Sequence, residues 1–114
     1  MGGENIINEI IISKRIPIEA ILSGEVNQII RIAWKNKWST GAIFGLKCSF
    51  KDKDSIKVII VESKEQVAKN ISDEVLDKCY YKNREKFREE WQKWYQEWDS
   101  TAWVIKFKLS DVNN

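Results

Sequence analysis

Residues 71–109 read ISDEVLDKCYYKNREKFREEWQKWYQEWDSTAWVIKFKL, a pattern that predicts two helices and a closing strand. Ser72 precedes two acidic residues, the pattern of a helix N-cap whose first turn complements the helix dipole. Asn83 can cap a second helix in the same way, because large aromatic residues then recur at helical spacing. These aromatic residues are Phe87, Trp91, Trp94, Tyr95 and Trp98. The spacing predicts an amphipathic helix with Trp91, Trp94 and Trp98 in the core.

A strand is predicted directly after this helix. Trp103, Ile105, Phe107 and Leu109 alternate with Val104, Lys106 and Lys108. Strict alternation of this kind is typical of a β-strand with one buried face. The domain is therefore expected to end on a strand.

The first half of the chain reads as short strands with one early helix. Strands are expected at 6–12, 28–34, 44–50 and 56–61, the last of them almost continuously apolar and therefore expected to be central and covered on both faces. Pro17 suits the first turn of a helix, and Gly24 suits its end. In the strand at 28–34, Arg31 points away from the face that carries Ile30. The order predicts an α+β fold, in which mostly antiparallel strands form a small β-barrel with flanking helices.

The composition fits one globular domain. The chain has 114 residues, 43% of them hydrophobic, and its 19 Lys+Arg and 17 Asp+Glu leave a net charge of only +2. Residues 1–114 are expected to form a single domain with its core at about 16–109. No apolar run is long enough for a membrane-spanning helix, so no membrane partner is expected.

Histidine is absent, which excludes a His-based triad, a His general base and a His-ligated zinc. Cys48 and Cys79 have no CxxC spacing and sit in apolar segments. They are best interpreted as two buried thiols in a reducing compartment, with a disulfide as the alternative. We expect a cytoplasmic protein with no cofactor and no metal.

Basic and aromatic residues are interleaved after the strand at 28–34. Cations hold phosphates and tryptophan stacks on unpaired bases, so this combination is what binding of single-stranded nucleic acid needs. The residues are Arg31, Trp34, Lys35, Lys37 and Trp38. Trp34 continues the Ile30 face and can instead be core, whereas Trp38 lies in a polar loop where either role fits.

The order of segments resembles the ASCH domain, a small β-barrel family of the PUA-like superfamily, from about Ile16 to Leu109. The first marker is Gly24 followed by Arg31, which is similar to the family pattern GxKxxxxR. The second is the run from Ile71 through the aromatic helix to Trp103–Phe107.

The resemblance implies RNA binding in a cleft beside the barrel, linked to RNA metabolism, translation or transcriptional regulation. One branch of the family resembles an amidohydrolase that uses a lysine, a threonine and a glutamate. Here the first two positions carry Val26 and Ile29, which can be neither nucleophile nor base. The resemblance therefore retains Gly24 and Arg31 and drops the deacylase chemistry, so catalysis is less expected than binding.

The sequence thus favours a module that binds single-stranded or structured RNA. Its predicted contacts are Lys14, Arg15, Gly24, Arg31, Trp34, Lys35, Lys37 and Trp38. An enzyme that processes nucleotides or RNA, such as a hydrolase or ribonuclease, is one alternative. An adaptor that presents exposed aromatic residues to a protein partner is the other.

Overall fold

The computed structural model describes residues 5–12, 15–32, 40–48, 55–95 and 97–110. The strands are β1 (Asn5–Ile12), β2 (Gln28–Ile32), β3 (Ala42–Lys47), β4 (Ile56–Val67) and β5 (Thr101–Leu109). The helices are α1 (Ile18–Leu22), α2 (Asp73–Lys78) and α3 (Arg84–Tyr95), with a short 3-10 turn at Ala68–Asn70. None of the described helices is long and apolar enough to cross a membrane.

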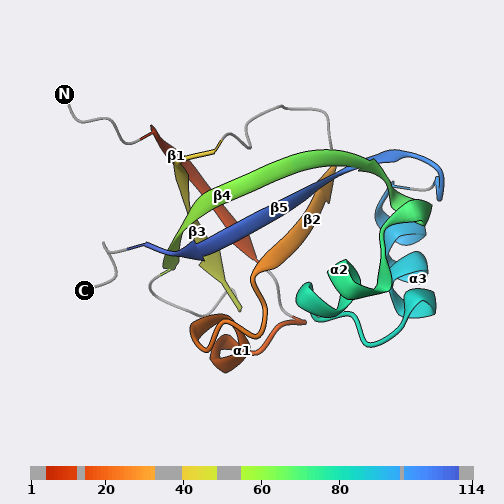
Figure 1. Ribbon diagram of the computed structural model, residues 1–114, viewed down its shortest axis with the longest axis horizontal. Coiled ribbons are helices and arrows are strands. Elements are labelled where there is room, and N and C mark those ends of the chain that lie inside the picture. Colours follow the sequence, from red (N-terminus) through yellow and green to blue (C-terminus); the bar gives the residue numbers. More distant parts are fainter. Residues whose placement is uncertain (1–4, 13–14, 33–39, 49–54, 96, 111–114) are drawn as a thin grey trace.

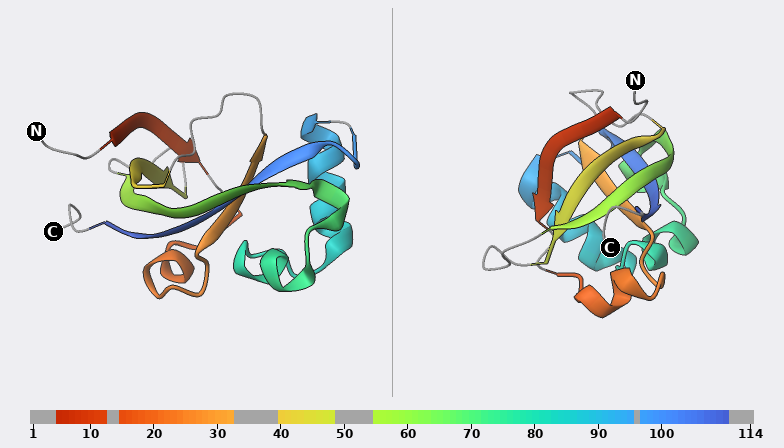
Figure 2. Two further views of the ribbon diagram at one scale, coloured as in Figure 1. Left: turned by 45° about the horizontal axis from the view of Figure 1, so that its top comes forward. Right: turned by 90° about the vertical axis from the view of Figure 1, so that its left-hand side faces the viewer.

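The strands form one curled sheet in the order β1-β3-β4-β5-β2. β3, β4, β5 and β2 pair antiparallel with their neighbours, whereas β1 is parallel to β3. Figure 2 shows the sheet bent into a half-barrel, with edge strands β1 and β2 facing each other. The predicted α+β fold of mostly antiparallel strands with flanking helices is confirmed, and the described strands form a half-barrel where a small barrel was predicted.

Two hydrophobic cores lie on opposite sides of β5. Ile105 and Phe107 point into the half-barrel, where they meet Phe44 and Leu46 of β3. Ala102 and Val104 point to the other side, where α2 and α3 cover them. We call these the barrel core and the helix core.

The helix ends follow the predicted caps. The Val75 N–H donates to Ser72 Oγ (3.2 Å), and the Lys86 N–H donates to Asn83 Oδ1 (2.9 Å). Gly24 has φ +85° and its N–H donates to the Ile21 carbonyl, which confirms it as the residue that ends α1. Pro17 lies one position earlier than predicted, at the N-cap of α1.

One of the three tryptophans predicted to lie in the core is exposed. Phe87 and Trp91 are in the helix core, but Trp94 is 54% exposed. Helix α3 ends at Tyr95, and the chain then turns so that Trp98 packs on Phe87 with ring centroids 5.4 Å apart. Trp98 therefore completes the cluster from outside the helix, while Trp94 is largely exposed.

Strand β4 is central, as predicted, but it is not covered on both faces. Val58 and Ile60 are buried in the barrel core, whereas Val61 is 42% exposed. The strand also continues through a polar stretch to Val67. A register shift between Ile60 and Glu62 changes which residues face the barrel, so that the strand can continue past its apolar part.

Trp91→Ala is expected to lower the free energy of unfolding by about 3 to 5 kcal/mol, because it removes a large aromatic side chain from the helix core. Its indole Nε1 also donates to the Glu97 carbonyl (2.8 Å). Trp94→Ala is the matched control and should cost less than about 1 kcal/mol. Denaturant melts of both variants test this, and equal losses would contradict the assignment of Trp91 to the core.

Candidate nucleic-acid interface

Arg31 lies on the concave face of the half-barrel, beside an aromatic residue. It is directly opposite Trp103 in the β2–β5 pair, and Trp103 is directly opposite Glu65 in the β4–β5 pair. Opposite residues of antiparallel strands point to the same face, with Cβ atoms about 5 Å apart. The three strands therefore present a row, Arg31–Trp103–Glu65, which we call the concave row.

Trp103 has a polar atom that the described part of the chain leaves without a partner. Its ring is half-buried and packs against the barrel core. Its Nε1 is buried, yet no acceptor among the described residues is within hydrogen-bonding distance. A buried donor without a partner costs about 1 to 3 kcal/mol, so an incoming acceptor would be stabilised at this position.

Arg15 forms hydrogen bonds with the segment that connects α2 and α3. Its Nη1 donates to the carbonyls of Cys79 (2.9 Å) and Tyr80 (2.7 Å), at the C-terminal end of α2. Tyr80 has φ +67°, so the chain turns sharply here and these carbonyls face the guanidinium instead of continuing a helix. The Arg15 guanidinium also lies 3.7 Å from the centroid of the Tyr81 ring, and its Nε is 3.5 Å from Glu90 Oε2.

The structure brings the charges of Arg15 and Arg31 to one neighbourhood. Burial raises the pKa of Tyr81 to about 12, while Arg15, and more weakly Arg31, act to lower this pKa. Burial likewise raises the pKa of Cys79 to about 12, against the opposing effect of Arg15. Both groups are neutral at pH 7, and the carboxylate beside Arg15 is that of Glu90, which acts to raise the pKa of Tyr81.

The other three positions compared with the family pattern lie beside a groove or in the barrel core. Gly24 borders a groove of about 290 Å³ that also contains Asn27 and Lys108. Val26 and Ile29 are fully buried in the barrel core. The two positions that carry polar catalytic groups in the amidohydrolase branch are thus part of the hydrophobic interior.

Five of the predicted contacts lie outside the described residues. They are Lys14, Trp34, Lys35, Lys37 and Trp38. These five stay predictions. Strand β2 ends at Ile32, so the chain that carries four of them continues from the Arg31 end of the strand.

The sequence reasoning missed Trp103 and Glu65 as neighbours of Arg31. In the sequence, Trp103 is an alternating strand residue and part of the second marker of the resemblance. Neither observation predicts its proximity to Arg31, because that depends on the pairing of β2 with β5 across more than half of the chain. Cys48 and Cys79 form no disulfide, as predicted, and Cys79 is buried, whereas Cys48 was predicted to be buried and is half-buried.

Stability should fall at alkaline pH because two buried groups resist ionisation. The pKa of Cys79 rises from 9.0, and that of Tyr81 from 10.0, to about 12 in the folded protein. A raised acid pKa means that the unfolded chain releases its proton first, so the stabilisation is complete below the unfolded pKa and is lost as pH rises toward 12. Relative to the wild type, Tyr81→Phe should therefore gain about 1 to 2 kcal/mol between about pH 10 and pH 12. Denaturant melts at several pH values test this, and parallel pH curves for the two proteins would contradict it.

Comparison with solved structures identifies the fold. No family model and no curated protein matches the sequence. Among solved structures, the chain is similar to an ASCH domain from Lactobacillus crispatus JV V101, with a TM-score of 0.60 and 14% identity. The match covers 80% of this chain and 68% of that one.

Two further structures agree. Protein EF3133 from Enterococcus faecalis V583, described with the family DUF984, matches with a TM-score of 0.62 and 10% identity over 96% of this chain and 81% of that one. Hypothetical protein PH0355 matches with a TM-score of 0.58 and 16% identity over 89% of this chain and 98% of that one. The chain therefore has the PUA-like fold of the ASCH domain.

Proposed function

We propose that this chain is an RNA-binding module that contacts an unpaired nucleotide at the concave row. The observation that carries the proposal is the cross-strand pair of Arg31 and Trp103, in which a cation lies beside an aromatic ring whose Nε1 has no acceptor among the described residues. Arg31 would bind a phosphate or a base edge, and Trp103 Nε1 would donate to an oxygen of the same nucleotide.

Arg15 has a different role in this proposal. Its guanidinium already binds two carbonyls and lies near Glu90, so its donors are largely engaged within the protein. We assign it to positioning the turn between α2 and α3, with its charge paired to that of Glu90. The predicted contacts of Lys35, Lys37 and Trp38 would extend the same interface beyond β2.

Binding fits the described residues better than catalysis does. Cys79 is buried and its pKa is about 12, so this thiol is neither accessible nor ionised as a nucleophile must be. Val26 and Ile29 are aliphatic and lie in the barrel core. Glu65 remains as a carboxylate in the concave row, where it can accept hydrogen bonds from base amino groups.

Arg31→Gln is expected to weaken binding of labelled single-stranded RNA about ten-fold, because it removes a charge-assisted contact. Binding measured at several salt concentrations should give a log–log slope of about −2 to −3 for the wild type, if three or four phosphates are neutralised at about −0.7 each. Arg31→Gln should flatten this slope by about 0.7, whereas Arg31→Lys should keep the slope and lose only part of the affinity.

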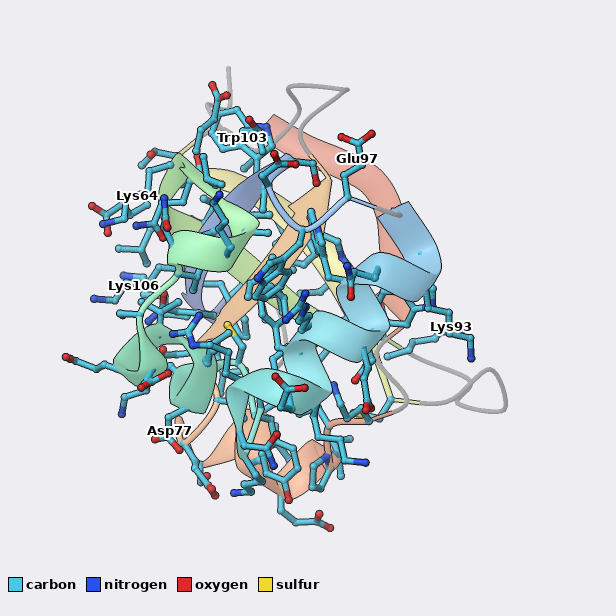
Figure 3. All side chains as sticks on the ribbon, turned by 90° about the vertical axis from the view of Figure 1, so that its right-hand side faces the viewer. Lys64, Asp77, Lys93, Glu97, Trp103 and Lys106 are labelled. Carbon is cyan, nitrogen blue, oxygen red and sulfur yellow. The ribbon has the colours of Figure 1, made fainter. Side chains whose placement is uncertain are left out.

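Lys93→Gln on α3 is the control, because it removes the same charge from an exposed position on the other side of the molecule from Lys64 and Lys106 (Figure 3). Denaturant melts establish that each variant is folded. The proposal fails if the folded wild type binds no RNA at low salt, or if Arg31→Gln and Lys93→Gln bind equally well. Removing Lys35 and Lys37 together tests the predicted loop contacts in the same assay.

A further inference from the structure

Lysines gather on the convex face of the sheet, opposite to the concave row. In β5, Lys106 and Lys108 alternate with Ile105 and Phe107, which point into the barrel core, so both lysines point outward and are exposed. Pairing with β4 continues the same face, since Lys108 is opposite Ile59 and Lys106 is opposite Glu62.

The register adds further lysines from the two neighbouring strands. Lys64 of β4 is opposite Val104, and Lys57 of β4 is opposite Gly45, both on the outward side of their strands. Lys47 follows two residues after Gly45 on β3 and so has the same orientation. The convex lysine face thus comprises Lys47, Lys57, Lys64, Lys106 and Lys108.

The convex lysine face is more positively charged than the chain as a whole. On the outward positions of β3, β4 and β5, these five lysines are accompanied by a single acidic residue, Glu62. The whole chain has 19 basic and 17 acidic residues, so an average patch would be nearly neutral. Asp77 of α2 lies below Lys106 in Figure 3 and marks one border of the face.

The helices that the structure describes leave the outward side of Lys106 open, and the end of α1 at Leu22 and Gly24 borders Lys108. Helices α2 and α3 pack on Ala102 and Val104, at the other end of β5, and leave the Lys106–Lys108 part of the β4–β5 pair open (Figures 1 and 2). Lysines two residues apart on a strand are spaced by about 6.7 Å. Lys106 and Lys108 thus form a short line of charge along β5.

A nucleic acid backbone matches this arrangement better than a membrane does. On the outward side of the described strands, the exposed apolar residue between the lysines is Val61, and Ile59 beside it is half-buried. Two exposed leucines border Lys108, but Leu109 is on the inward side of β5, opposite Val58, and Leu22 belongs to α1. A membrane-binding surface would combine the cations with aromatic or leucine side chains that insert into the lipid. Lysine is a flexible point charge that binds phosphates without reading bases, which suits contact with a backbone.

We propose that the convex lysine face is a second RNA contact that binds backbone phosphates. This proposal rests on the proposed function, because it extends the path of an RNA bound at the concave row. Trp103 and Lys64 lie at the same end of the β4–β5 pair but on opposite faces, so an RNA strand bound at Trp103 would pass around that end of the sheet to reach Lys64. The face would add affinity for longer RNA without adding sequence preference.

The test compares two triple variants that remove the same charge. Lys64, Lys106 and Lys108 are changed to Gln in the first, and the exposed Lys82, Lys86 and Lys93 on the helical side are changed to Gln in the control. With single-stranded RNA of about sixteen nucleotides, the first should bind at least about ten-fold more weakly at low salt, and its log–log slope should be flatter by about 2. With RNA of about four nucleotides, the first and the control should bind alike.

The outcomes separate this proposal from the previous one. If Arg31→Gln weakens binding but the first triple variant binds long RNA like the control, the convex contact is wrong and the concave site stands. If the triple variant loses binding and Arg31→Gln does not, the concave site is wrong and the lysine face binds RNA alone. Binding to vesicles with phosphatidylserine is measured as well. If the first triple variant binds these vesicles more weakly than the control but binds RNA equally well, the proposal is overturned. Denaturant melts confirm that both triple variants are folded.

Discussion

Strand β5 is buried on both faces, and this burial fixes how the neighbouring strands pair with it. Alternate side chains of this strand enter two different cores, with Ile105 in the barrel core and Val104 in the helix core. Because side chains alternate with a period of two, a slip of one residue would exchange all of them. The register of β5 is therefore fixed from both sides, and β2 and β4 inherit it through their pairing with β5.

The candidate site follows from that register. Arg31 and Trp103 are neighbours only because β2 pairs with β5 at this register, and the orientation of Trp103 toward the half-barrel is shared with Ile105 and Phe107. The outward positions of the same strand carry Lys106 and Lys108 beyond the region that the helices cover. One strand thus contributes to a hydrophobic interior, an aromatic contact and a charged surface.

Local sequence predicted the elements well and their surroundings less well. The caps at Ser72 and Asn83 and the glycine at Gly24 depend on neighbouring residues, and all three were predicted from sequence. The exposure of Trp94 was not, because helical spacing places it near Trp91 but cannot show that α3 ends and that Trp98 returns over Phe87.

Contacts between residues far apart in the sequence could not be predicted from neighbouring residues either. The RNA contact of Arg15 stays a prediction, and its partners within the protein, the carbonyls of Cys79 and Tyr80, are more than sixty residues away in the sequence. The exposure of the outward face of β4 could not be predicted either, since β-branched residues favour a strand whether or not its second face is covered. Arg31 was singled out correctly as pointing away from Ile30, because that depends only on alternation.

The pairing of β2 also has a consequence for the order in which the chain folds during synthesis. Strand β2 lies at an edge of the described sheet and pairs there with β5, whose residues 101–109 are made some seventy positions later. Contacts between segments so distant in sequence form slowly, and a nascent chain cannot form them until the second segment has left the ribosome. Until then β2 has an unpaired, isoleucine-rich edge, of the kind that chaperones protect from aggregation. The side of the molecule proposed to bind RNA would be the last to assemble.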